Sequence, residues 1–415
     1  MSKETNKLIP ELRFPEFKKD GKWEDKTLSD ICNVTNGKSN AQDHLENGKY
    51  PLFDRSAVIK ASDSFIFDCQ AVIIPGEGMR FIPKYYEGKF DLHQRAYALK
   101  DFNCNGQFVF YSMLHRSNLL SQKAVLSTVL SLRLPILQNF PIEIPKNPKE
   151  QQKIASCLSS LDELIAGHSE KLELLKEHKK GMMQNLFPQE GETEPKVRFR
   201  EFHSKEGWIQ EPLDDIYKFI VTNSYTRDDL NYESGTVKNI HYGDIHTKFP
   251  TLFDIRKEKV PFINSSISIE NINPECYCIE GDIIFADASE DLNDVGKSIE
   301  IVNLNNEKLV SGMHTLLARQ KEAKLIVGFG GHLFKSKWIR SQIQNEAQGA
   351  KVLGVSAKRL LNIKISYPRN KKEQQKIANC LSSLDELIMA QEEKIGQLKL
   401  HKKGLMQGLF PKLND

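Results

Sequence analysis

The chain has 415 residues, a formal net charge of +3 and a hydrophobic fraction of 39%, which predict two to three globular domains with substantial cores. The charge is too small to identify a polyanionic partner by itself. No apolar run approaches the roughly 18 residues of a membrane span, and MSKETNKLIP lacks the apolar core of a signal peptide, so we expect a cytoplasmic protein without a membrane partner. The seven scattered cysteines form no CxxC pair and predict free thiols.

The first recognisable element is a lead-in from Pro10 to Ile31, which returns without a gap from Pro195 to Ile216. PELRFPEFKKDGKWEDKTLSDI aligns there with PKVRFREFHSKEGWIQEPLDDI. The identical positions of the two copies include Arg13/Arg198, Phe14/Phe199, Glu16/Glu201, Phe17/Phe202, Trp23/Trp208, Leu28/Leu213 and Ile31/Ile216. A lead-in that occurs twice predicts two copies of one module.

A variable block follows each lead-in, at about residues 32–147 and 217–368, and the two blocks do not align over their length. Both contain short β-forming runs bounded by Gly, Asp and Asn, such as QAVIIPGEG at Gln70 and KSIEIVNL at Lys297. Helical stretches follow at Gln107 and His332, and each block ends on a strand and a proline. Each block is therefore expected to be an α+β domain.

A long helix is predicted after each block, because Glu150–Pro188 returns as Glu373–Pro411 with 28 of 39 paired positions identical. Apolar residues alternate at spacings of four and three, which is the heptad pattern of a coiled coil. The expected seam residues are Ile154, Leu158, Leu161, Ile165, Leu172, Leu175, Ile377, Leu381, Leu384, Ile388, Ile395 and Leu398. Polar residues interrupt both seams at equivalent places, His168 with Gln391 and Lys179 with Lys402.

A pairing between the two helices explains these interruptions, since polar seam residues can fix register. The alternative is that each helix packs only on its own domain. Helices of this length would span about 55 Å and act as spacers. The domain division that we predict is 1–147, 148–189, 190–368 and 369–415.

Motifs for catalysis are missing from the chain. DVGKS at Asp294 ends like a phosphate-binding loop, but Asp291 stands where that loop needs its first glycine, so a turn is the better interpretation. No NPPY or DPPY tetrapeptide of amino-methyltransferases occurs. His241, Asp244 and His246 have a spacing that a metal could use, but structural or DNA-facing roles are favoured on a strand and turn. We therefore expect no catalytic residues and no metal site.

The whole chain resembles the DNA specificity subunits of type I restriction-modification systems. The resemblance rests on the RFxEF...W....L.DI lead-in, the block-terminal IEIP or ISYP followed by EQQKIA, the SSLDELI heptads and the HKKG(L/M)MQ(N/G)LFP ending. It implies two target recognition domains, each reading one half of a split asymmetric site on double-stranded DNA, related by a pseudo-twofold repeat. The conserved helices would form an antiparallel coiled coil that separates these domains.

The resemblance also implies partners: two modification (methyltransferase) subunits and two restriction (translocase and nuclease) subunits. S-adenosylmethionine, ATP and Mg²⁺ would be bound by those partners, with no cofactor in this chain. The helices would set the spacing of the half-sites and dock the methyltransferase subunits.

DNA-contacting residues must then come from the two blocks, because base edges are read by Arg, Lys, Asn, Gln or His and phosphates are held by Lys or Arg. The candidates in the first block are Lys38, Arg80, Lys84, His93, Gln94, Arg95 and Lys123. Those in the second are Asn239, His241, Tyr242, Lys297, His314, Arg319, Lys351 and Lys358. For each one, the alternative is a solvated surface residue.

Two other functions remain as alternatives. A coiled-coil scaffold without DNA affinity would use the helices alone, and a self-contained restriction or modification enzyme would need motifs that the sequence lacks. Salt-dependent DNA binding distinguishes the first alternative from a specificity subunit.

Overall fold

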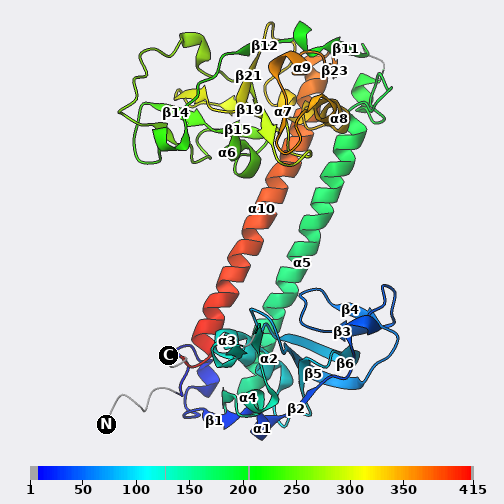
Figure 1. Ribbon diagram of the computed structural model, residues 1–415, viewed down its shortest axis with the longest axis vertical. Coiled ribbons are helices and arrows are strands. Elements are labelled where there is room, and N and C mark those ends of the chain that lie inside the picture. Colours follow the sequence, from blue (N-terminus) through cyan, green and yellow to red (C-terminus); the bar gives the residue numbers. More distant parts are fainter. Residues whose placement is uncertain (1–7, 127, 204–205, 413–415) are drawn as a thin grey trace. The chain divides into compact units, whose positions relative to one another are not determined.

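The computed structural model describes residues 8–126, 128–203 and 206–412. These divide into two compact units: unit 1 contains residues 1–171 and 391–415, and unit 2 contains residues 172–390. Both long helices contribute to both units, since α5 covers Pro148–Leu186 and α10 covers Lys371–Leu409 (Figure 1). The predicted α+β fold class with two long helices is confirmed. The division differs from our residue-by-residue domain boundaries, because each helix is shared.

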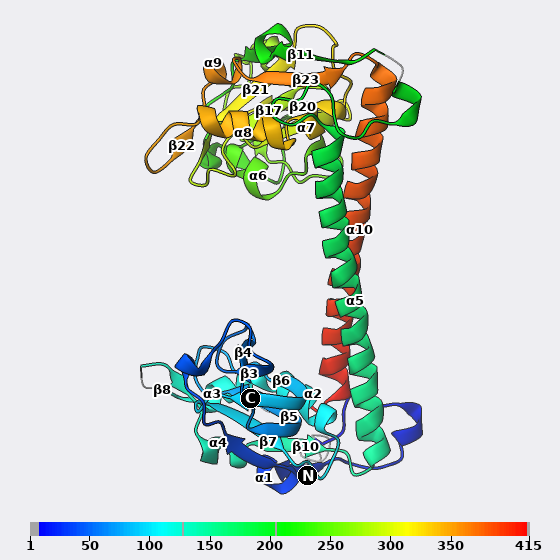
Figure 2. The ribbon, with the colours of Figure 1, turned by 90° about the vertical axis from the view of Figure 1, so that its right-hand side faces the viewer.

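Within unit 1, the first part of α5 packs against the last part of α10 in antiparallel sense (Figure 2). Lys402 Nζ donates to both carboxylate oxygens of Asp162, at 2.5 and 2.6 Å. Gln391 Nε2 donates to the carbonyl oxygen of His168 at 2.8 Å. In unit 2 the equivalent pair is Lys179 with Asp385. The polar interruptions of both seams therefore pair across the helix interface.

The heptad positions separate the buried from the exposed apolar residues of these helices. Seven seam residues are buried, and five are half-buried: Leu161, Ile165, Leu172, Leu175 and Ile388. By contrast, four leucines outside the seam are exposed, Leu164 by 46%, Leu174 by 59%, Leu387 by 54% and Leu400 by 71%. Four of the buried seam residues, Ile154, Leu158, Ile377 and Leu381, belong to the hydrophobic cores of the two units, so the seam serves both the blocks and the pairing of the helices.

Unit 1 is built on a six-stranded sheet with the order β2-β7-β5-β6-β3-β4 in its described residues. The strands are β2 (Asn33–Asn36), β3 (Tyr50–Phe53), β4 (Lys60–Ser62), β5 (Phe67–Pro75), β6 (Lys84–Leu92) and β7 (Ala96–Lys100). Outside this sheet, β8 (Val125–Leu126) pairs with β9 (Leu130–Ser131). The helices are α1 (Leu28–Ile31), α2 (Gly106–His115), α3 (Ser117–Lys123) and α4 (Leu134–Gln138), with short 3-10 turns at Pro15–Phe17 and Ala41–Asp43.

Unit 2 has a five-stranded sheet with the order β12-β21-β17-β19-β15 and a second sheet with the order β13-β16-β14-β20. The first contains β12 (Tyr217–Ile220), β15 (Leu252–Asp254), β17 (Ile283–Ala286), β19 (Ser298–Asn303) and β21 (Thr315–Gln320). The second contains β13 (Leu230–Asn231), β14 (Val237–Ile240), β16 (Phe262–Ile263) and β20 (Lys308–Ser311), while β18 (Ala288–Ser289) pairs with β22 (Leu353–Gly354). The helices are α6 (Tyr242–Thr247), α7 (Phe329–Leu333), α8 (Lys337–Glu346) and α9 (Ala357–Leu360), with 3-10 turns at Arg200–Phe202, Leu213–Asp215, Arg227–Asp229 and Pro274–Cys276.

The first five strands of the unit 1 sheet repeat the unit 2 order with the same directions. The third strand is antiparallel to both neighbours in each sheet, and the fifth is parallel to the fourth. Blocks that share no convincing sequence alignment therefore share one topology, because many sequences satisfy the same pattern of buried strands.

Both units close their block with the same set of contacts, which we call the frame: the lead-in, the last strand of the block and the EQQKIA start of the long helix. In unit 1, β1 (Glu24–Thr27) pairs with β10 (Pro141–Ile144), and in unit 2 β11 (Trp208–Pro212) pairs with β23 (Lys364–Pro368). The lead-in arginine forms a bidentate ion pair with the buried glutamate of the helix. Arg13 pairs with Glu150 and Arg198 with Glu373, with N–O distances of 2.7 to 2.9 Å.

The lead-in tryptophan donates to the same carboxylate, at 3.3 Å from Trp23 and at 3.2 Å from Trp208. The shared Arg, Trp and Glu positions of the two lead-ins and helices therefore form one buried polar cluster twice. Because an unpaired buried charge is costly, each member holds the others in place.

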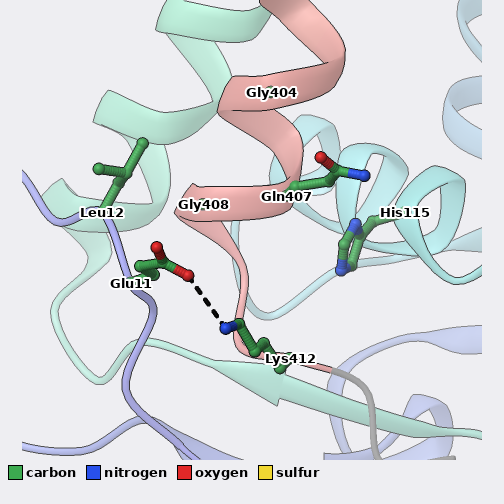
Figure 3. Close-up of a pocket in the computed structure, with 7 residues that line it drawn as sticks. All are labelled: Glu11, Leu12, His115, Gly404, Gln407, Gly408 and Lys412. Carbon is green, nitrogen blue, oxygen red and sulfur yellow. Dashed lines mark ion pairs between the residues drawn. The ribbon is translucent and has the colours of Figure 1, made fainter.

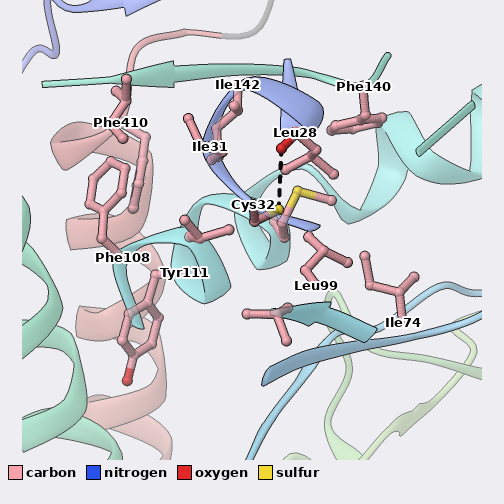
Figure 4. Packing of buried hydrophobic residues seen from close by; sticks show 14 of the residues in the cluster. Leu28, Ile31, Cys32, Ile74, Leu99, Phe108, Tyr111, Phe140, Ile142 and Phe410 are labelled. Atoms are coloured by element: carbon pink, nitrogen blue, oxygen red, sulfur yellow. Dashed lines mark hydrogen bonds between the residues drawn. The ribbon is translucent and has the colours of Figure 1, made fainter. Parts of the chain in front are cut away.

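The LFP ending of one helix fills the core of the unit that contains the start of the other. Phe410, directly after α10, packs edge-on against Trp23 in unit 1. It is also tilted against Phe108 (Figure 4). In unit 2 the same contacts are made by Phe187, directly after α5, with Trp208 and Phe329. This reciprocal core packing explains why HKKG(L/M)MQ(N/G)LFP is repeated so closely.

Candidate nucleic-acid interface

The equivalent strands of the two sheets end at equivalent loops. Pro75 at the end of β5 is opposite Ala96 at the start of β7, and Ala286 at the end of β17 is opposite Thr315 at the start of β21. The next residues are also bonded alike, because Gly76 N donates to Arg95 O at 2.8 Å and Asp287 N donates to His314 O at 3.0 Å. Arg95 and His314 therefore occupy the same backbone position in the two units.

A hollow of about 380 Å³ lies at this edge of unit 1, lined by Asn40, Asp54, Arg55, Lys60, Glu77, His93, Gln94 and Arg95. We call its lining the loop edge of unit 1. Every one of these side chains is polar or charged. A site with this composition suits hydrogen bonding to a polar, anionic partner rather than binding of an apolar ligand.

The charges of this loop edge are held by ion pairs. Arg95 Nη1 lies 2.8 and 3.0 Å from the two carboxylate oxygens of Glu77. Lys60 Nζ lies 2.7 Å from Asp54 Oδ2. Although burial alone would raise the pKa of Asp54, hydrogen bonds from Lys60 and Ser56 keep that pKa below its ordinary value. Asp54 is therefore ionised at neutral pH and orients the lysine.

Five of the seven candidates in the first block gather around this hollow. His93, Gln94 and Arg95 line it, and Gln94 Nε2 donates to Asn40 Oδ1 at 2.8 Å. Lys38 is exposed next to it, since its backbone N donates to Leu92 O. Lys84 Nζ donates to the carbonyls of Ser56 and Ala57, and burial lowers the pKa of this lysine. Lys84 thus supports the loop that carries Arg55.

Arg80 and Lys123 lie on segments adjoining the loop edge and are exposed. Arg80 follows Gly78, whose backbone N donates to Leu130 O in β9. Lys123 ends α3, directly before β8. Exposure leaves both free to meet a phosphate, but neither lines the hollow.

Unit 2 has a hollow of about 590 Å³ at the equivalent edge. Its lining, the loop edge of unit 2, consists of Asp287, Ala288, His314, Leu316, Gln348, Gly354, Val355, Ser356, Ala357 and Arg359. His314 Nδ1 lies 3.3 Å from Asp287 Oδ1, and the His314 side chain is 54% exposed. Burial raises the pKa of Asp287, and the contact with His314 opposes that rise. His314 also has a left-handed backbone, with φ of 54°.

Aromatic side chains join His314 to a second group of candidates. The Tyr242 ring is edge-on to His314 at 5.3 Å and tilted against His241 at 4.6 Å. Contrary to the strand and turn expected here, Tyr242 and His246 lie on helix α6. His241 accepts from Gly243 N as the cap of this helix, and its pKa is lowered by burial and by Arg227. The histidines serve packing and capping, and the described residues contain no metal-binding group.

Three candidates of the second block are engaged by contacts within the block. Asn239 is fully buried in β14 and accepts from Asn223 Nδ2 at 2.9 Å, so it has no surface to offer DNA. Arg319 is 15% exposed and is paired with Asp282 at 2.7 Å. Lys297 Nζ donates to His246 O at 2.7 Å. These residues stabilise the block, whereas Lys351 and Lys358 are exposed.

The loop edges include polar residues that the sequence argument missed: Asn40, Arg55 and Lys60 in unit 1, and Gln348 and Arg359 in unit 2. Arg55 lies in the loop after β3 and Lys60 begins β4, and this segment reaches the edge because β3 runs parallel to β6. A signal was present in the Asp54-Arg55-Ser56 turn, but sequence spacing does not bring it next to Arg95.

The family model for the type I restriction modification DNA specificity domain matches residues 20–177 and 205–400. The chain is 26% identical over 431 residues to the putative type I restriction enzyme MjaX specificity subunit of Methanocaldococcus jannaschii, covering 94% of this chain and 92% of the relative. It is 27% identical over 139 residues to the EcoDI specificity subunit of Escherichia coli, where the match spans 34% of this chain and 31% of that protein.

Among solved structures, the S subunit of the type I restriction-modification system from M. genitalium shares the fold. It superimposes with a TM-score of 0.66 at 16% identity, covering 98% of this chain and 100% of that one. A chain from a study of complex assembly and conformational transition of the type I R-M system gives a TM-score of 0.54 at 15% identity, with 94% and 97% covered. With both halves matched by the family model, the chain belongs to the type I restriction-modification DNA specificity family.

Proposed function

We propose that this chain is the DNA-reading subunit of a type I restriction-modification complex, and that each unit reads one half of a split, asymmetric site. The observation that carries the proposal is that one frame, repeated contact by contact, holds two sheets of one topology with unlike loop edges. Two edges presented in the same manner but with different side chains suit two different half-sites.

The chain acts without chemistry of its own. The described residues contain no group of acids, histidines and cysteines that would hold a metal ion, and the sequence lacks the methyltransferase tetrapeptides. S-adenosylmethionine, ATP and Mg²⁺ belong to the partner subunits in this proposal. In the part of the chain that the structure describes, no helix is both long and apolar enough to cross a bilayer. We place the complex in the cytoplasm, where its DNA is.

The long helices supply the docking surface for modification subunits. Leu164 and Leu387, which differ in number by the repeat offset of 223, are both exposed outside the seam, by 46% and 54%. An apolar side chain exposed at the same place in both repeats suits a partner that binds twice. Two modification subunits on the two equivalent helix faces, and two restriction subunits beyond them, complete the complex.

The test is to co-express the chain with its modification subunit and to map methylated adenines across the genome. A split motif with unlike halves is the expected result. Exchange of residues 32–147 for the block of a relative should change one half of the motif only. A change in both halves would contradict modular reading.

Salt dependence separates this function from that of a scaffold. Affinity for duplex DNA should fall steeply between low and moderate salt, because phosphate contacts release counterions. Binding that ignores salt, or absence of binding, would favour a coiled-coil scaffold. Methylation or cleavage by the purified chain alone would favour a self-contained enzyme.

A further inference from the structure

Which side chains of the two loop edges read bases is a question that rests on the proposed function. Arg95 and His314 stand at one backbone position in two sheets of the same topology. A third equivalent bond confirms the correspondence, since Leu132 N donates to Gly76 O and Val355 N donates to Asp287 O, both at 2.8 Å. The backbone of this edge is therefore fixed alike in the two units, and the side chain at this position differs.

Each of the two side chains is exposed and lies beside a carboxylate, which Arg95 hydrogen-bonds and which His314 approaches to 3.3 Å. Arg95 is 63% exposed, and its partner Glu77 is 15% exposed. His314 is 54% exposed, and its partner Asp287 is 28% exposed. An exposed cationic or imidazole group fixed by a more buried acid has fewer conformations to lose when it meets a partner. This arrangement distinguishes the pair from exposed lysines such as Lys38, which suit phosphate contacts.

The atoms that remain available define what each side chain can read. Glu77 engages Nη1 of Arg95, and in the described residues Nε and Nη2 of that arginine have no hydrogen-bond partner. Two parallel N–H donors match the O6 and N7 acceptors of guanine in the major groove. The carboxylate oxygen near His314 Nδ1 favours the proton on that nitrogen. Nε2 is then an acceptor, which matches the amino group of adenine or cytosine.

We propose that Arg95 and His314 are the specificity-determining residues of equivalent positions in the two half-sites. Arg95 reads a guanine for unit 1, and His314 reads an amino-bearing base for unit 2. Glu77 and Asp287 are positioning residues, which orient these side chains without touching the DNA. The two units thereby recognise different bases with the same backbone geometry.

The experiment is genome-wide mapping of methylated adenines in cells that express the modification subunit with the wild-type chain or a variant. Arg95→Ala should relax one position of one half-site, with a loss of discrimination against other bases of about tenfold to a hundredfold. His314→Ala should relax one position of the other half-site. Glu77→Gln should relax the Arg95 position to a smaller degree, a change in motif letters that a merely structural role would not produce.

A matched control is available in unit 2. Arg256 is 56% exposed and pairs with Asp254 at 2.7 Å, much as Arg95 pairs with Glu77, but it lines neither hollow. Arg256→Ala should leave every letter of the motif unchanged. The thermal midpoint of each purified variant shows that it is folded.

The outcomes separate this inference from the proposed function. A wild-type chain that directs no split methylation would contradict the proposed function itself. With a split wild-type motif, an unchanged motif in folded Arg95→Ala, or a uniform loss at all sites with unchanged letters, overturns the inference and leaves the function standing. Should Arg95→Ala not fold, Arg95→Lys and Glu77→Gln decide by the same criterion. Both replacements are close in size to the original side chain, and Arg95→Lys also keeps the positive charge.

Discussion

The two units share the residues and hydrogen bonds of the frame, but at the loop edges they share only the backbone bonds. At the frame, Arg13, Trp23 and Glu150 of unit 1 match Arg198, Trp208 and Glu373 of unit 2 in identity and in hydrogen bonds. At the loop edges, the backbone bonds match but the side chains do not. The two units share the residues that assemble them and differ in the residues that we propose to face DNA. Four predictions test how complete this contrast is.

The largest effect should come from the aromatic cores. Phe410→Ala and Phe187→Ala each remove a fully buried ring that contacts the lead-in tryptophan, and each should cost about 3–5 kcal/mol of unfolding free energy. The two losses should agree closely in urea denaturation. As a control, Leu400→Ala on α10, where the side chain is 71% exposed, should change the free energy of unfolding little. A large difference between the two phenylalanine variants would break the equivalence of the frames.

The frame glutamates should follow. Glu150→Gln and Glu373→Gln each leave a nearly buried arginine without its carboxylate, at a cost of about 3 kcal/mol. Denaturant midpoints of both variants, with exposed Lys149→Gln as the control, check this prediction. A harmless Glu150→Gln would mean that the cluster contributes little to closing the block.

The third prediction concerns pH and separates the two units. Burial raises the pKa of Glu300 to about 7, against hydrogen bonds from Gly331 and Gly328 that lower it. The pKa of Glu300 in the folded state lies above its value in the unfolded state. Its contribution to the free energy of unfolding is therefore complete below about pH 4.5 and is lost as the pH rises through 7. The loss is at most about 3 kcal/mol, on the order of 1.4 kcal/mol per pKa unit.

Tyr85 pairs with Val72 as Glu300 pairs with Ile283, so Tyr85 occupies the equivalent position in unit 1 and unit 1 lacks this acid. Glu300→Gln should therefore flatten the fall in stability between pH 5 and 8, while Tyr85→Phe should leave it in place. Stability curves at several pH values measure both. A curve unaltered by Glu300→Gln would show that other groups control this range.

The smallest effect is expected at the helix pairing. Lys402→Met removes the contact with Asp162, and Lys179→Met removes the contact with Asp385. Both pairs are partly exposed, so each change should cost less than about 1 kcal/mol and the two values should match. The Asp162→Asn and Asp385→Asn variants complete the double-mutant cycles. A coupling free energy well above this value would mean that the ion pairs contribute more to fixing the register of the two helices.

Sequence patterns predicted the elements that repeat and are strongly periodic. The two long helices, the lead-ins and the strands of Gln70–Pro75 and Lys297–Asn303 were predicted because heptads, turn residues and β-forming runs are local signals. The sharing of each helix between both units was not predicted, since it depends on contacts such as Phe410 with Trp23 that join distant segments.

The candidate site was predicted less completely. His93, Gln94 and Arg95 were selected from the sequence as polar residues of an expected loop, and they line the hollow. Arg55 and Lys60 reach the same hollow only through the parallel pairing of β3 with β6. Asn239 was selected by residue type, yet its strand lies between β16 and β20 and buries it. Burial of a polar residue that finds its partner in another strand leaves no local mark in the sequence.

The ending of α10 has one more consequence. In unit 1, Leu12 N donates to Gly408 O at 2.8 Å, and Lys412 forms an ion pair with Glu11 at 3.2 Å (Figure 3). In unit 2 the equivalent bond joins Val197 N to Asn185 O at 3.0 Å, and there the peptide chain itself connects the two segments through residues 188–196. The two units therefore close the same junction differently, with a covalent connection in unit 2 and a covalent gap in unit 1. A circular permutant, with a short peptide across the gap near Glu11 and Lys412 and new ends opened between 189 and 195, should keep the frame of both units and exchange the order in which the two blocks are synthesised.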